Sequence, residues 1–361
     1  VVMLYAVIMR FDSLREIMSS LQAESRKLCH LGIRLMPSRS TLSDANRRRP
    51  EIIFESIYRD LYTTYRNILS SDSRKNRDKV WMKRLQIIDT TTITLFSNLL
   101  FKGVGRHPKT GKKKGGIKVH TVIHANEGVP SDIKFTSAAT NDSFMLRPSV
   151  MNKGDIIAMD RAYIDYEKLE TLTQREVMYV TKMNKNLKYN IIEDCMYQND
   201  KGFMEVRIQN VTFSKMLKDG TILIHHARII TYVDIKKHKL VSLLTNDMES
   251  DPNEIIGIYH KRWEIELLFK QIKQNFPLKY FYGESANAIK IQIWVTLIAN
   301  LLLMVMKKKL TRSWSFSGLA TMMRITLMYY VDFYSLFNHP EKDWETLLDV
   351  RQKEDCQLSI F

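Results

Sequence analysis

The strand-like runs between residues 85 and 183 limit the possible folds of this chain most strongly. The runs "LQIIDTTTITLF" (85–96), "GIKVHTVIHA" and "SDIKFTSAA" are rich in Ile, Val and Thr, which favour extended backbone. A fourth run, "DIIAM", is followed by a helical pattern and then by "VMYVTKM". Three strands followed by a strand, a helix and a strand predict an α/β fold built on a mixed sheet.

The segments around these strands show other patterns. Apolar residues have helical spacing near the N-terminus, alternate with polar residues after the core strands, and then return to helical spacing. We therefore expect a helical region at 1–78, a core at 79–183 and 251–328, an all-β insertion at 184–250 and a polar tail at 329–361. The opening "VVMLYAVIMRF" is typical of the middle of a buried helix, so we expect residues before Val1 to be missing.

The balance of charges points to a polyanionic partner. The 361 residues include 55 Lys and Arg against 39 Asp and Glu, a formal net charge of +16. Nucleic acid is the commonest partner of such a chain, although a basic surface also serves solubility alone. Two clusters suit contact with phosphates, and each also suits a solvated helix end or a plain loop. They are Arg47, Arg48 and Arg49 in a helical segment, and Lys112, Lys113 and Lys114 in the glycine-rich loop at 101–116.

Cysteine spacing and hydropathy indicate a cytoplasmic protein. Cys29, Cys195 and Cys356 are far apart and lie outside any CxxC motif, which is typical of free thiols in a reducing compartment. The apolar run at 291–306 has 16 residues and is interrupted by polar ones, which is short for a membrane span. We expect a buried core helix there and no contact with a membrane.

Two aspartates come at the ends of buried strand-like runs. Asp89 follows "LQII", and Asp160 follows "DIIAM". Residues at strand ends of an α/β sheet face the crevice in which ligands bind. If the two strands are neighbours, the carboxylates lie within a few ångströms, and a divalent metal resolves their repulsion. Aspartates at such positions are also frequent turn or cap residues, so this pair alone leaves both interpretations open.

A polar stripe marks the segment "YHKRWEIELLFKQIK" at 259–273. At about 100° per residue, a helix places Tyr259, Arg262, Glu266 and Lys273 within an arc of roughly 60°. A carboxylate between two cations suits a metal ligand beside groups that hold phosphates. The alternative is a solvated stripe with ordinary ion pairs such as Arg262–Glu266, which contribute little stability.

These four residues fulfil the pattern Y-x2-R-x3-E-x6-K. It resembles the signature of bacterial insertion-sequence transposases of the DDE type, in the group named after insertion sequence four. "IDTTTITL" and "MDRAYIDY" are similar to the stretches that carry the two aspartates in this family, with Ala162 where glycine is usual. "GGIKVHTVIHANEGVP" is similar to the stretch between them, and the β-rich segment falls in the matching interval. "SRSTLSDANRRRPEIIFESIY" resembles the N-terminal region of one branch of the group.

The resemblance implies an RNase H-like α/β core with a helical N-terminal DNA-binding domain and a β insertion. Asp89, Asp160 and Glu266 would form the catalytic triad and hold two Mg²⁺ ions, for which Mn²⁺ substitutes. The reaction would be hydrolysis at the element ends, followed by transfer of the freed 3′ hydroxyl groups to target DNA. The partners would be double-stranded DNA, both the terminal inverted repeats and the target, and a second copy of the chain as a homodimer on DNA.

The same resemblance implies further contacts with DNA. Tyr259, Arg262 and Lys273 match residues that hold the DNA end and its phosphates. A general role near the site is implied for four residues in matching motifs, which are Lys118, His120, Arg161 and Tyr163.

The insertion departs from the family pattern in one respect. Relatives that cut through a hairpin place a tryptophan just before the strand matching "LLT", where this chain has Leu240 and Val241. Either the hairpin route is absent, or a ring such as Tyr232 or Phe213 replaces the tryptophan. A related metal-dependent nuclease or integrase is one alternative function, and a catalytically idle DNA-binding remnant is another.

Overall fold

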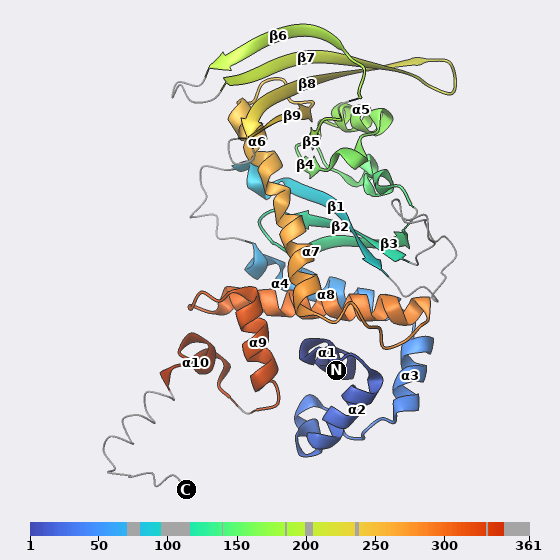
Figure 1. Cartoon of the computed structure of the whole chain (residues 1–361), viewed down its shortest axis with the longest axis vertical. Coiled ribbons are helices and arrows are strands. Elements are labelled where there is room, and N and C mark those ends of the chain that lie inside the picture. The colour runs from blue at the N-terminus through green and yellow to red at the C-terminus, as the bar shows by residue number, and fades with distance from the viewer. Residues whose placement is uncertain are drawn as a thin grey trace. The chain divides into compact units, whose positions relative to one another are not determined.

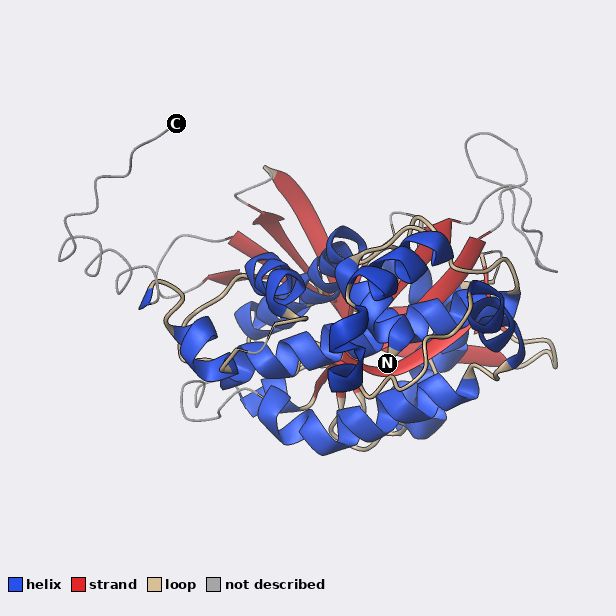
Figure 2. Ribbon diagram, turned by 90° about the horizontal axis from the view of Figure 1, so that it is seen from below, coloured by secondary structure: helices blue, strands red, loops and turns tan. Residues whose placement is uncertain are grey.

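The structure of the protein is a computed structural model, and it describes residues 1–70, 80–94, 116–138, 140–184, 186–198, 205–234, 238–329 and 331–342. The chain forms two compact units, Val1–Leu69 with Gln271–Phe361 and Ser70–Lys270 (Figure 1). The boundary falls inside one helix, α7 (Trp263–Asn275). The strands, which are red in Figure 2, belong to the second unit, and the described part of the first unit is helical.

The described residues of the second unit form a nine-stranded mixed sheet with the order β3-β2-β1-β4-β5-β9-β8-β7-β6. β1 is antiparallel to β2 and parallel to β4, and β4 is parallel to β5. This arrangement agrees with the predicted mixed α/β sheet. The strands are β1 (Leu85–Thr94), β2 (Gly116–His124), β3 (Pro130–Ser137), β4 (Ile156–Met159), β5 (Met178–Lys182), β6 (Asn190–Gln198), β7 (Glu205–Met216), β8 (Ile222–Asp234) and β9 (Lys239–Thr245).

The strands of the β-rich insertion continue the same sheet. β9 pairs antiparallel with β5, from Val180 opposite Thr245 to Lys182 opposite Leu243. β8, β7 and β6 then follow as successive antiparallel neighbours. The insertion that the alternation predicts is therefore an extension of the core sheet. The pairing of β9 satisfies the backbone groups along the side of β5 that β4 leaves open.

The outermost strand of the insertion is irregular. β6 pairs with β7 along its length, but the register shifts between Ile191 and Glu193, where Ile192 has no opposite residue. Such a bulge bends the strand and increases its local twist.

Short helices connect these strands and cover the sheet. β4 is buried at all four positions, as expected for a central parallel strand covered on both faces. A hydrophobic cluster joins Ile157 and Met159 of β4 to Leu169 of α5 and Phe213 of β7, so the insertion shares the core. The helical elements of this unit, besides α7, are η3 (Val80–Lys83), η4 (Asp142–Met145), η5 (Pro148–Val150), η6 (Arg161–Tyr163), α5 (Tyr166–Gln174) and α6 (Pro252–Lys261).

A buried hydrogen-bonded chain also joins the insertion to the core. The Tyr179 hydroxyl of β5 lies 2.7 Å from Nε2 of His225 in β8, and Nδ1 of His225 lies 2.8 Å from Glu170 of α5. Tyr179 and His225 are fully buried. Burial lowers the pKa of His225, although the bond to Glu170 acts in the opposite direction.

This histidine predicts a loss of stability in mild acid. The folded state binds its proton less readily than the unfolded state, where the pKa is about 6.5. The stabilisation is present above that pH and is lost as the pH falls from there through the lowered folded pKa. We expect His225→Gln to reduce the dependence of the unfolding free energy on pH between 7.5 and 5.5, measured with urea. His226→Gln, at the adjacent exposed position, is the control; it removes only the smallest of the causes that act on the pKa of His225 and should keep most of the wild-type dependence. Equal pH dependence in both variants would refute this role.

The first unit packs around one long helix, α8. By length and composition α8 could cross a membrane, but 78% of its most apolar 18-residue window is buried inside the protein. The buried helix expected at 291–306 is therefore the centre of this unit, packed against α1, α3, α4 and α9. The helices here are α1 (Val2–Met9), α2 (Leu14–Ala23), η1 (Ser25–Leu31), α3 (Arg39–Arg48), α4 (Ile52–Leu69), α8 (Ala286–Lys309), α9 (Phe316–Thr326) and α10 (Phe333–Asn338), with the end of α7.

Candidate active site

The two predicted aspartates lie side by side at the centre of the sheet. β1 and β4 are parallel neighbours, and their last paired residues are Ile88 and Met159. Asp89 follows Ile88 within β1 and Asp160 comes directly after β4, so the expected adjacency of the two strands is confirmed. Asp89 lies within β1, where its Oδ1 accepts a bond of 2.8 Å from the Thr90 backbone N–H. Asp160 caps η6, and its Oδ1 accepts a bond of 3.0 Å from the backbone N–H at position 162.

The segment that carries Glu266 is not the single helix that we predicted. α6 ends at Lys261, Arg262 occupies a turn, and α7 begins at Trp263. The backbone N–H of Arg262 bonds to the carbonyl of Tyr259 at 3.0 Å, so the local pattern is i to i+3 instead of i to i+4. The expected stripe is thus divided between two helices, with Arg262 at the break.

Arg262 joins two of the three predicted catalytic carboxylates. Its Nη2 donates to Glu266 Oε1 at 2.5 Å, and its Nη1 donates to Asp89 Oδ2 at 3.4 Å. The residue is 8% exposed, and its guanidinium lies 5.5 Å from the centre of the Tyr259 ring. The ion pair considered as an ordinary surface contact is therefore part of a buried site that reaches Asp89.

The pKa of Asp89 responds to its burial and to the charges around it. Burial is the main cause that raises the pKa of Asp89 to about 6, and the charges of Asp160 and Glu266 raise it further. The Thr90 N–H and the Arg262 guanidinium act in the opposite direction. A carboxyl group with this pKa is largely ionised at pH 7.5 and can serve as a ligand.

The residue types suit a divalent metal, but the three carboxylates are not close enough together to hold one in the structure. Among the described residues, no group of three or more His, Cys, Asp or Glu side chains is close enough to hold a metal ion. The guanidinium of Arg262 instead supplies the positive charge between Asp89 and Glu266. Carboxylate oxygens are the ligands that Mg²⁺ prefers, so the residue types fit.

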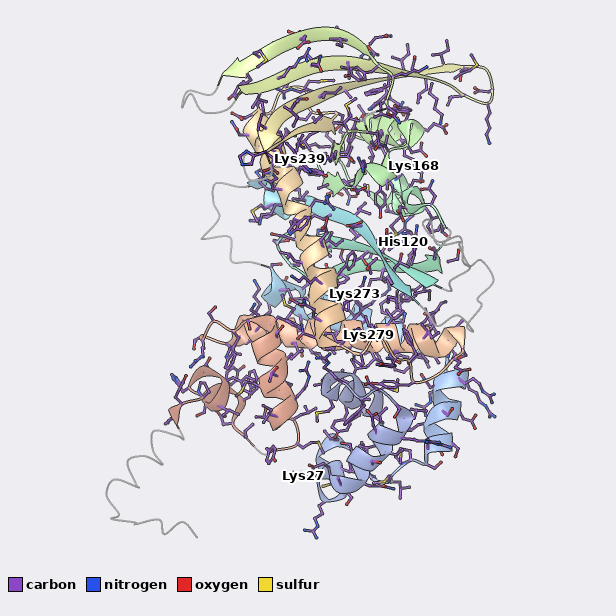
Figure 3. The ribbon with its side chains drawn as sticks, viewed as in Figure 1. Lys27, His120, Lys168, Lys239, Lys273 and Lys279 are labelled. Carbon is purple, nitrogen blue, oxygen red and sulfur yellow. The ribbon has the colours of Figure 1, made fainter. Side chains whose placement is uncertain are left out.

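Two residues expected near DNA are buried. Tyr163 is 1% exposed, and burial, followed by the charge of Asp89, raises the pKa of its hydroxyl well above the usual range. His120 lies inside β2 (Figure 3), is fully buried, and pairs through Nε2 with Thr136 at 2.6 Å. Burial also lowers the pKa of His120. Both side chains are buried in the structure, and their general role near the site stays a prediction.

The side chain of Lys118 also bonds to other groups of the protein. Its Nζ donates to the Thr140 carbonyl at 2.6 Å and to Asp142 Oδ1 at 2.9 Å. Asp142 was not among the predicted site residues. The only local signal is the "NDS" turn sequence, in which Asn141 caps η4, and its partners are distant in sequence.

The other predicted DNA contacts lie elsewhere. Arg161 is exposed beside Asp160, and Tyr259 is half-buried at the end of α6. Lys273 lies in the last turn of α7, in the part that belongs to the first unit, and burial lowers its pKa. Lys112, Lys113 and Lys114 fall outside the described residues.

The arginine cluster lies where α3 gives way to α4. Arg47, Arg48 and Arg49 are exposed, and the first two pair with Asp44. The Asn287 side chain of α8 donates to the carbonyls at 46, 47 and 49, which fixes this turn by satisfying the end of α3.

The two rings considered as replacements for the missing tryptophan are in the core. Phe213 is 1% exposed and stacks on Tyr166 at 5.2 Å, and Tyr232 is 2% exposed with its hydroxyl 3.2 Å from His260. Neither ring is free to stack on a flipped base.

The large mixed sheet fits the RNase H-like core of a DDE transposase. The chain belongs to the family described as Transposase DDE domain, whose model matches residues 81–302. It is therefore a DNA transposase, a nucleic-acid-cleaving enzyme of a class that depends on divalent metal. Action on DNA agrees with the predicted cytoplasmic location. A second model, described as a domain of unknown function (DUF4372), matches residues 1–34.

Three curated proteins are similar to most of the chain. "Putative transposase y4zB" of Sinorhizobium fredii is 26% identical over 75% of this chain and 72% of its own length. "Probable transposase for insertion sequence element IS5377" of Geobacillus stearothermophilus is 23% identical over 65% and 60% respectively. "Putative transposase for insertion sequence element IS4SA" of Synechocystis sp. is 24% identical over 73% and 70%.

Proposed function

We propose that this transposase cuts and pastes a DNA element by metal-dependent hydrolysis and strand transfer, with Asp89, Asp160 and Glu266 as the catalytic carboxylates. The parallel pairing of β1 with β4 carries the proposal, because the residues preceding the two aspartates are opposite each other. The Arg262 guanidinium supports the third assignment, because it ties Glu266 to Asp89.

The three carboxylates would hold two Mg²⁺ ions or, in their place, Mn²⁺. When bound, these ions supply an activated nucleophile and stabilise the leaving oxygen of an in-line phosphoryl displacement. The chain contributes the positions of its ligands. Asp89 and Asp160 each keep one oxygen bonded to a backbone N–H, which limits the rotation of both carboxylates. Arg262 pairs with Asp89 and Glu266, and with metal held by these carboxylates it would be a cation for a DNA phosphate.

The proposed partners are double-stranded DNA, as terminal inverted repeats and as target, and a second copy of the chain on that DNA. Support for DNA comes from the net charge of +16 and from the exposed Arg161 and arginine cluster. The helical region at 1–78 is the proposed DNA-binding region, and Tyr259 and Lys273 are proposed to contact the DNA end. Two ends require two active sites, which is the reason for proposing a dimer.

The proposal is tested with duplexes that carry the DNA flanking the gene. We expect the wild-type protein to nick them at the element boundary with Mg²⁺ or Mn²⁺ and to be inactive in EDTA. Asp160→Asn should remove the activity. Asp132→Asn is the control, because Asp132 belongs to β3 of the same sheet and pairs with Arg147.

The products distinguish the alternatives. Metal-dependent cuts without preference for the boundary would indicate a nuclease, and binding without cleavage would indicate an idle remnant. Activity retained in Asp160→Asn would contradict the assignment of the carboxylates.

A further inference from the structure

Asp142 connects three elements beside the catalytic carboxylates. Its Oδ1 accepts a bond of 3.0 Å from the Thr90 hydroxyl of β1 and a bond of 2.9 Å from Lys118 Nζ of β2. In the β1–β2 pairing Lys118 is opposite Thr92, two residues from Thr90, so both donors lie on one face of the sheet. A single oxygen of Asp142 thus accepts hydrogen bonds from two side chains on this face.

The bond to Thr90 reaches Asp89 through a single residue. The Thr90 hydroxyl is held by Asp142, and the Thr90 backbone N–H donates to Asp89 Oδ1 at 2.8 Å. Threonine is branched at Cβ, so a fixed hydroxyl selects one rotamer and restrains the backbone to which it is attached. Asp142 thus holds the residue whose backbone N–H bonds to the Asp89 carboxylate.

The negative charge of Asp142 is balanced by Lys118. Asp142 and Lys118 form a half-buried ion pair, with side chains 23% and 17% exposed. Lys118 also donates to the Thr140 carbonyl, which anchors the segment before Asp142. On the other side, Lys168 of α5, labelled in Figure 3, donates to the Ser143 carbonyl at 2.5 Å. The segment is therefore fixed on both sides of the aspartate.

We propose that Asp142 is a positioning residue, which orients the metal ligand Asp89 through the Thr90 hydroxyl while Lys118 neutralises its charge. The inference rests on the proposed role of Asp89 as a metal ligand. The alternative is that Asp142 is itself a fourth metal ligand. In that case its effect on metal binding would not depend on Thr90. Groups that orient metal ligands typically contribute 10- to 100-fold to affinity or activity.

The test compares Thr90→Val and Asp142→Ala in the full chain. Both remove the same bond from opposite ends, so each should raise the Mn²⁺ concentration for half-maximal binding by about 10- to 100-fold. Binding is measured from the electron paramagnetic resonance signal of free Mn²⁺, and single-turnover cleavage is followed over the same range. The double variant should be no worse than the single ones, because the two residues act through one bond.

Conservative variants separate positioning from general damage. Thr90→Ser keeps the hydroxyl, and Asp142→Asn keeps the accepting oxygen, so both should restore most of the affinity. Thr231→Val removes a strand hydroxyl that bonds to Ser242 in the insertion, away from these carboxylates, and should leave Mn²⁺ binding unchanged. Thermal unfolding shows which variants are merely destabilised.

Two results would overturn the proposal. One is wild-type Mn²⁺ affinity in Thr90→Val and Asp142→Ala, even if their melting temperatures fall. The other is a loss in Asp142→Asn with none in Thr90→Val, which would make Asp142 a ligand itself. A wild-type protein that binds Mn²⁺ but does not cut element ends would contradict the proposed function, while the Mn²⁺ titrations would still decide the role of Asp142.

Discussion

Replacing Glu266 by glutamine is expected to abolish metal-dependent strand cleavage and leave DNA binding nearly intact. Glutamine keeps the size of the side chain and a hydrogen-bond acceptor for Arg262, but it loses the charge that a metal ligand needs. We expect the single-turnover rate to fall by about three orders of magnitude, the scale on which the loss of one essential group slows an enzyme. Fluorescence anisotropy with element-end DNA, at fixed salt, measures the binding.

The same helix provides a matched control. Glu264 lies two residues before Glu266 and pairs with Lys261 at 2.6 Å, with both side chains about one-third exposed. Such pairs contribute little, so Glu264→Gln should cleave at the wild-type rate. Equal losses of binding and cleavage in Glu266→Gln, or equal losses of cleavage in both variants, would contradict the catalytic role.

Replacing Arg262 by glutamine is expected to destabilise the metal-free protein and to strengthen metal binding. The variant leaves Asp89 and Glu266 close together without their shared cation. Removing one partner of a buried ion pair costs about 3–5 kcal/mol, and the 34% exposure of Glu266 reduces this to about 2 kcal/mol. A divalent metal should restore more stability to the variant than to the wild type, because no guanidinium has to be displaced.

Urea unfolding in EDTA and in Mn²⁺ measures both effects. Arg207→Gln is the control, because Arg207 pairs with Asp194 on the exposed insertion, where its side chain is 52% exposed. That variant should lose little stability and gain none from Mn²⁺ beyond the wild type. If Mn²⁺ stabilises Arg262→Gln no more than the wild type, Arg262 does not compete with metal at these carboxylates.

The sequence predicts those features of the site that depend on local patterns. Strand propensity locates β1 and β4, and each aspartate follows directly from the end of an apolar run. The break at Arg262 could not be predicted, because the helical spacing of the apolar residues continues through it. The i to i+3 bonds there accompany the burial of the guanidinium against Asp89, a residue more than 170 positions away.

Other features depend on which elements become neighbours. Alternation predicts strands in the insertion but does not say which edge they join, so the continuation from β5 to β9 was not foreseen. Asp142 has an unremarkable local sequence, and its role depends on Thr90 and Lys118, which reach it through the tertiary fold. The burial of Tyr163 and His120 likewise follows from packing and not from the motifs that contain them.

The bulge in β6 has a consequence for the solubility of this molecule. β6 is the last strand of a nine-stranded sheet, and it exposes Ile191, Ile192 and Met196. A long regular edge of this composition would recruit strands from other chains and start aggregates. The shifted register at Ile192 interrupts the row of backbone donors and acceptors, and Glu193 directly after it adds a charge that an incoming strand would have to desolvate. The irregular edge thus lowers the tendency of this extended sheet to pair with strands of other chains.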